Sequence, residues 1–155
     1  MASLTDKFDV IRGWEPGGDA SIDQSLPPKK VLGVPVTLLP GNLIVIDTNG
    51  DVDVATSPAD VSLGTAMPPQ VYIVLEGNGQ DFSAVFVEKV VALRGKLTVK
   101  TDKLTPAQTF PISGKVTYSA GLLSDHAATA TTHSIGSVLA NNIAVDGTII
   151  VEVDL

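Results

Sequence analysis

The run 148–155 constrains the fold of this chain more than any other segment, because apolar and polar side chains alternate along it. The inward-facing set is Ile149, Val151, Val153 and Leu155. Glu152 and Asp154 fall on the opposite face. A period of two is the signature of a strand with one buried face. The run therefore predicts a core strand whose two acids lie in solvent or at a subunit rim, away from any chemistry.

Further strands follow from Val31 onward. The segment 96–100 alternates in the same way, with Leu97 and Val99 inward, and 114–118 repeats the pattern. The continuous apolar run 71–75 is bounded by proline and glycine pairs, which predicts a strand buried on both faces. The segment 83–93 supplies one long strand or two broken ones.

The clearest hairpin joins 43–47 to 51–55 through Asn49-Gly50, since both turn residues tolerate positive φ. About eight to ten strands are expected in total, and helix signals are weak. The fold class is thus all-β: a compact antiparallel β-barrel or sandwich, β-tulip or jelly-roll-like, with an extended N-terminal arm.

Residues 1–30 are the expected arm, and residues 31–155 the β-domain. The first segment is rich in glycine and proline and carries too few large apolar groups to build a core. Its candidate interaction residues are Phe8, Val10, Ile11, Trp14, Ile22 and Leu26. Trp14, the one tryptophan, is read as an interface anchor, with packing on its own domain as the alternative.

Composition excludes several classes of function. A formal net charge of −7, from 17 acids and 10 scattered bases, disfavours nucleic-acid binding. With no cysteine there is neither a disulfide framework nor a thiolate metal site. No apolar run approaches the roughly 20 residues of a membrane span, and the start of the chain lacks the features of a secretion signal, so we expect a protein made in the cytoplasm that does not enter a membrane.

Two polar patterns could carry chemistry. Asp47, Asn49, Asp51 and Asp53 recur at every second position, like the opening of a calcium loop. The required glycine is misplaced and the closing glutamate is Pro58, so a hairpin with acids on its solvent face is favoured.

The histidines, His126 and His133, are seven positions apart in a stretch of small residues and are read as solvated loop side chains. They are too few for a zinc site, and no nucleophile-elbow pattern accompanies them. We expect no catalytic residue, no metal site and no cofactor, and hence a protein that is not an enzyme.

The C-terminal unit resembles part of a known family. It consists of Ile135-Gly136 with a short strand, then Asp146-Gly147 and the alternating run 148–155. Together with a polar arm, 41–47 and 90–99, it is similar to the head decoration (cement) proteins of tailed bacteriophages.

The resemblance implies a β-rich protein on the outer surface of the virion capsid. Its partners would be the major capsid protein, whose neighbouring subunits it clamps together, and further copies of itself, as a trimer more often than a dimer. The family's N-terminal arm commonly orders on the capsid. Two alternatives stay open: another structural virion protein, such as a tail-tube or minor capsid component, and a ligand- or carbohydrate-binding β-sandwich.

Overall fold

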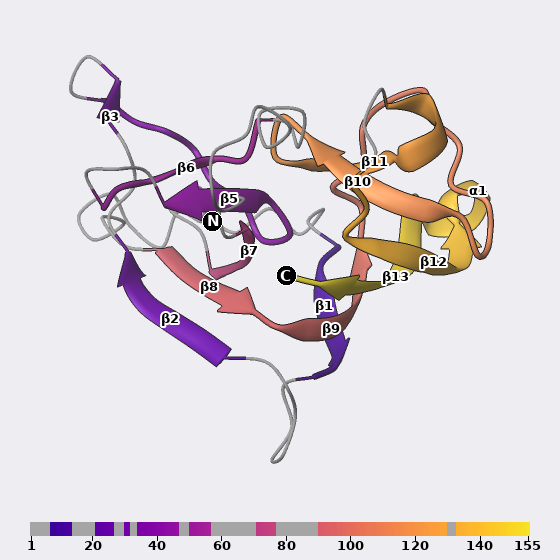
Figure 1. Cartoon of the computed structure of the whole chain (residues 1–155), viewed down its shortest axis with the longest axis horizontal. Coiled ribbons are helices and arrows are strands. Elements are labelled where there is room, and N and C mark those ends of the chain that lie inside the picture. The colour runs from indigo at the N-terminus through magenta and orange to yellow at the C-terminus, as the bar shows by residue number, and fades with distance from the viewer. Residues whose placement is uncertain are drawn as a thin grey trace.

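Two antiparallel β-sheets make up most of the part of the protein that the structure describes (Figure 1). The computed structural model describes residues 7–13, 21–26, 30–31, 34–46, 50–56, 71–76, 90–129 and 133–155. For 21–26, 30–31, 34–35 and Glu76 it describes the backbone alone. The all-β prediction is confirmed, and the described strands form two open sheets without closing into a barrel.

The larger sheet has six strands and contains the C-terminal run. From edge to edge they are β1 (Asp9–Arg12), β9 (Lys96–Thr101), β13 (Thr148–Asp154), β12 (Gly136–Asn142), β10 (Lys115–Ser119) and β11 (Leu122–Asp125). β13 lies between β9 and β12 and has the predicted alternation, with Ile149, Val151 and Val153 each fully buried and Asp154 exposed. Leu97 and Val99 of β9 also point inward, as predicted.

The smaller sheet has five strands. Their order is β2 (Ser21–Leu26), β8 (Val90–Arg94), β7 (Val71–Glu76), β5 (Leu43–Ile46) and β6 (Val52–Val54). β5 and β6 form the predicted hairpin, and Gly50 in its connection has φ of 83°. A separate two-stranded ladder joins β3 (Lys30–Val31) to β4 (Val34–Pro35).

Two glycines connect the sheets. Gly95, at φ 121°, lies where the chain leaves β8 of one sheet and enters β9 of the other. Gly121, at φ 78°, lies in the β10–β11 turn; its N–H donates to Ala55 O at 2.8 Å and its carbonyl accepts from Leu43 N at 2.9 Å. A turn of the larger sheet is thereby hydrogen-bonded into the smaller one.

The main core fills the space between the sheets. Leu43, Ile73 and Leu93 of the smaller sheet pack in one cluster with inward side chains of the larger sheet, among them the fully buried Leu123. A second cluster lies on the far face of the smaller sheet, where Tyr72 and other β-strand residues pack with Leu38. β7 is therefore buried on both faces, as its continuous apolar run predicts.

The segment expected to be an arm contributes two edge strands to these sheets. β1 pairs antiparallel with β9, and β2 pairs antiparallel with β8. The sequence did not predict these partners, because each strand is short and pairs with residues 64 or more positions away, as Leu26 does with Val90. No local pattern reveals such a partner. The division of function between residues 1–30 and 31–155 stays a prediction.

Candidate interaction surface

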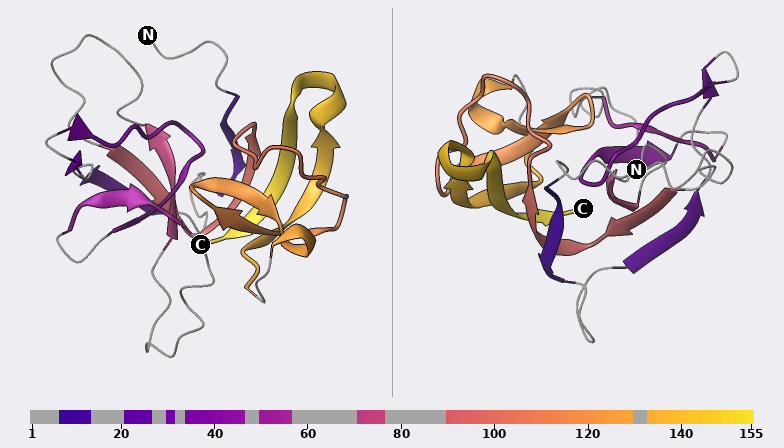
Figure 2. Two further views of the ribbon diagram at one scale, coloured as in Figure 1. Left: turned by 90° about the horizontal axis from the view of Figure 1, so that it is seen from above. Right: turned by 180° about the vertical axis from the view of Figure 1, so that it is seen from behind.

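The most prominent exposed feature is a group of aliphatic side chains at the end of the β12–β13 hairpin. They are Ile112, 66% exposed, Leu139, 49%, Ile143, 38%, and Val145, 87%. We call these four residues the apolar tip. Figure 2 shows the hairpin that carries three of them projecting from the larger sheet. Large aliphatic side chains at this level of exposure, gathered in one place, are typical of interaction sites.

Ile112 belongs to this group because its loop is bonded to β12. Ser113 N donates to Val138 O at 2.8 Å. The Asn141 amide nitrogen donates to Phe110 O at 2.9 Å. These two bonds lie on either side of Leu139 along β12, so the loop and the strand present their aliphatic side chains from a common base.

Leu139 lies at a β-bulge. The register between β12 and β13 shifts between Val138 and Ala140, which leaves Leu139 without an opposite residue. Neighbouring side chains of a strand face opposite sides, so Leu139 follows the inward Val138 on the outer face. Val138, next to it, is 1% exposed and belongs to the core.

A single helical turn, α1 (Ile143–Asp146), presents Ile143 and Val145 to solvent and buries none of its residues. Asn141 Oδ1 accepts from Ile143 N at 3.0 Å, which satisfies one free donor at the start of the turn. Gly147 ends it at φ 80°, and its N–H donates to Ile143 O at 3.1 Å. The turn is thus held in place by side-chain and backbone hydrogen bonds rather than by packing.

Asp146 fixes the base of the apolar tip. Its carboxylate lies 2.8 Å from Lys100 Nζ and accepts from Thr148 N at 3.1 Å, and its backbone carbonyl accepts from Lys7 Nζ. The hydrogen bond from Lys100, followed by that from the Thr148 side chain, lowers the pKa of Asp146 from 3.8 to about 2. The exposed aliphatic groups therefore stand on an ordered support, which reduces the entropy lost when they bind a partner.

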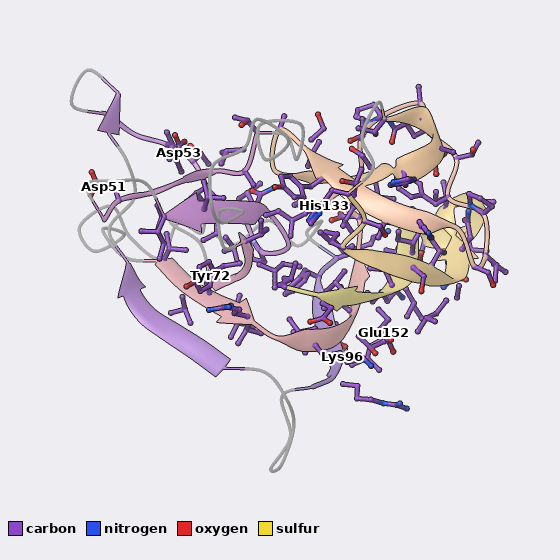
Figure 3. All side chains as sticks on the ribbon, viewed as in Figure 1. Asp51, Asp53, Tyr72, Lys96, His133 and Glu152 are labelled. Atoms are coloured by element: carbon purple, nitrogen blue, oxygen red, sulfur yellow. The ribbon has the colours of Figure 1, made fainter. Side chains whose placement is uncertain are left out.

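The outward face of the larger sheet has a different character. Lys96 Nζ and Glu152 Oε1 lie 3.8 Å apart on neighbouring strands, and Figure 3 shows the two side chains together. Asp154 lies opposite Lys96 in the same ladder. Opposite charges lie side by side on this face, as is usual for a face in contact with solvent. The prediction that Glu152 and Asp154 lie on the non-core side of β13 is confirmed.

The residues predicted to mediate arm contacts are dispersed. Phe8 and Val10 are half-buried against the main core, whereas Ile11 is 49% exposed. Ile22 and Leu26 lie in β2, of which the backbone alone is described, and Trp14 lies outside the described residues. The aliphatic residues of the apolar tip were not predicted, because Ile143 and Val145 occur in a short connector whose exposure the sequence pattern does not reveal.

The acid repeat does not assemble into a cluster within the described residues. Asp51 and Asp53 are half-buried on or beside β6, and Asp53 Oδ1 accepts from its neighbour Val54 N at 2.8 Å. Asp47 and Asn49 lie outside the described residues. In the described ranges no three histidine or acidic side chains are placed to hold a metal ion.

The histidines are partly buried rather than fully solvated. His126 begins a 3-10 helix, His126–Ala128, and its Nε2 is buried with no hydrogen-bond partner among the residues that the structure describes. His133 is half-buried as well. The sequence pattern of small residues around them missed this burial, because β10 packs against the 3-10 helix only in the folded chain.

Comparisons with known proteins leave the family open. A scan of family models, a search of curated proteins and a search of solved structures each found no match. Among the helices described, none has the length and apolar character needed to cross a membrane.

Proposed function

We propose that this protein is a structural component of a phage virion, a decoration or cement protein that binds the outer surface of the head. The single observation that carries the proposal is that the C-terminal unit, on which the family resemblance rests, also builds the apolar tip. An ordered aliphatic surface, with no comparable catalytic cluster among the described residues, suits a protein whose work is to bind.

The apolar tip would anchor the protein to the major capsid protein. Full burial of a valine or isoleucine side chain stabilises a complex by roughly 1.5–3 kcal/mol, so the four residues can supply a substantial part of an interface. The charged outward face of the sheet would remain in solvent at the virion surface. Bridging of neighbouring capsid subunits, and assembly of the protein as a trimer or dimer, belong to the same proposal, as does a finer fold description such as β-tulip or jelly roll.

A sugar-binding sandwich receives less support. Carbohydrate sites rely on exposed aromatic rings, and both tyrosines of the chain are buried, Tyr72 at 6% and Tyr118 at 2% exposure. Arg94 stacks over the Tyr72 ring, with its guanidinium carbon 6.0 Å from the ring centre. These two rings contribute to the cores and leave no face for a sugar.

The test is binding to expanded phage heads. The wild-type protein should co-sediment with shells that lack decoration protein, and the double variant Ile112→Asp with Val145→Asp should lose at least tenfold in affinity. Thr37→Asp with Thr56→Asp is the matched control, because both positions are exposed, lie outside the apolar tip and add the same two negative charges.

Equal binding by wild type, tip variant and control would contradict the role of the apolar tip. Absence of wild-type binding to any shell would contradict the decoration function. Formation of rings or tubes by the purified protein alone would favour a tail-tube component instead.

A further inference from the structure

The outer edge of β1 carries a second candidate interaction surface, independent of the apolar tip. β1 is the terminal strand of the six-stranded sheet, paired on one side with β9. Within the described part of the chain, no strand pairs with its other side. An edge strand presents backbone donors and acceptors that can pair with another strand. Figure 1 shows β1 beside β9 at this edge.

Two opposite charges lie at the ends of β1. Asp9 and Arg12 are both exposed, and neither forms an ion pair with another described residue. Charges on an edge strand normally discourage further pairing. A partner strand that places a charge of opposite sign against each of these two side chains can still pair with the edge, because the charges are then neutralised.

A β-bulge sets the geometry of this charge pair. In a regular strand, residues three positions apart face opposite sides of the sheet. Here the register shifts between Val10 and Arg12, so that Asp9 lies opposite Lys100 and Arg12 opposite Thr98. Lys100 and Thr98 are two positions apart on β9 and share a face, so Asp9 and Arg12 share it too.

We propose that the partner of this edge is a second copy of the same chain, paired antiparallel along β1 about a two-fold axis. Antiparallel pairing of two β1 strands places Asp9 of each copy opposite Arg12 of the other. A two-fold axis normal to the sheet keeps each residue on the same face in both copies. Because Asp9 and Arg12 share one face, both ion pairs can form on that face. Ile11, which is 49% exposed, lies at the bulge between these two ion pairs.

The charge order gives this edge its selectivity. When two β1 strands run antiparallel, an acidic Asp9 meets a basic Arg12 at each end of the contact. A strand with neutral ends would leave both charges unpaired, and a strand with one sign of charge would repel one of them. The contact is short, so the dimer should be weak and in rapid exchange with the monomer. The proposed assembly is a dimer with a two-fold axis, whereas the family that the chain resembles forms trimers more often than dimers.

Sedimentation velocity of the purified full chain, at concentrations up to about 1 mM, measures this association. We expect wild type to shift from monomer to dimer as the concentration rises. Asp9→Arg and Arg12→Asp each create like-charged pairs across the axis and should weaken the dimer at least tenfold. An equimolar mixture of the two variants should recover association, because each then supplies the charges that the other lacks.

The double variant Asp9→Arg with Arg12→Asp should also dimerise like wild type, and the homodimer signal should weaken as salt is raised. Thermal unfolding establishes that each variant is folded. Because arginine at position 9 would face Lys100 within the same chain, Asp9→Asn serves as a second variant at this position, with a smaller loss of association. A wild-type protein that is monomeric throughout the range, one that forms trimers, or single variants that dimerise as tightly as wild type would each overturn the proposal.

Discussion

The α-carbon of Gly136 lies against the carbonyl oxygen of Glu152, so that a β-carbon at position 136 would overlap that oxygen. Gly136 is the first residue of β12 and lies opposite Val153 in β13. The two strands belong to the C-terminal unit. Their close approach at this position leaves no room for a β-carbon, which explains why glycine follows Ile135.

Gly136→Ala should therefore destabilise the protein by about 3 kcal/mol, because the β12–β13 ladder must separate to admit a methyl group. Gly147→Ala is the matched control. Its β-carbon meets open space, and the cost there is the left-handed backbone alone, about 1 kcal/mol. Urea unfolding of the two variants measures the difference, and equal losses would contradict the steric argument.

Thr117→Val should stabilise the protein by about 1 kcal/mol. The Thr117 hydroxyl is buried and has no hydrogen-bond partner among the described residues, so its desolvation is uncompensated. Valine keeps the shape and removes the polar atom. Thr101→Val is the control: Thr101 is equally buried, but its hydroxyl accepts from Lys103 N at 3.0 Å, and its loss should destabilise. A loss of stability in Thr117→Val would show that the hydroxyl has a partner in solution.

Asp146 should make stability depend on acid pH. Its pKa falls from 3.8 to about 2 on folding, chiefly through Lys100, so the folded state binds the proton less tightly than the unfolded state. Its contribution to stability is present above pH 3.8 and is lost as the pH falls through about 2. The gap in Tm between wild type and Asp146→Asn should shrink across this window.

Lys100→Met supplies the control for this titration. Without the ammonium group, the midpoint of the Asp146 carboxyl signal in an NMR titration should move back toward 3.8. A midpoint that is the same with and without Lys100 would show that the ion pair does not persist in solution.

Gly121→Ala should loosen the junction between the two sheets. A β-carbon at this position would lie 2.8 Å from Val54 Cγ1, and the backbone has positive φ, so we expect a loss of about 2 kcal/mol. Amide exchange should accelerate at Leu43, whose N–H donates to the Gly121 carbonyl. Gly50→Ala, with a similar φ but open space, should cost less and leave Leu43 exchange unchanged.

Sequence periodicity predicted those strands whose burial alternates or is continuous. The segments 96–100 and 148–155 and the β5–β6 hairpin were found because their side-chain pattern directly reflects one buried face. β1 and β2 were not given partners, since an edge strand pairs mainly through its backbone, and backbone groups are the same in every residue.

The apolar tip was missed for a related reason. A valine or isoleucine in the sequence is expected to be buried, and Val145 is instead held outside by a one-turn helix. Conversely, His126 was expected in solvent and has a buried ring nitrogen. In both cases the exposure of the side chain depends on how segments distant in the sequence pack, and the local amino-acid composition does not predict that packing.

The position of β13 between β9 and β12 has a consequence for synthesis on the ribosome. Strands β9 through β12 leave the exit tunnel before β13, yet β9 and β12 have no ladder to each other without it. The larger sheet must therefore wait, half-assembled, until residues 148–154 emerge. During that interval the nascent chain depends on the hairpins already formed, and on chaperones, to keep its inward-facing valines and isoleucines from aggregating.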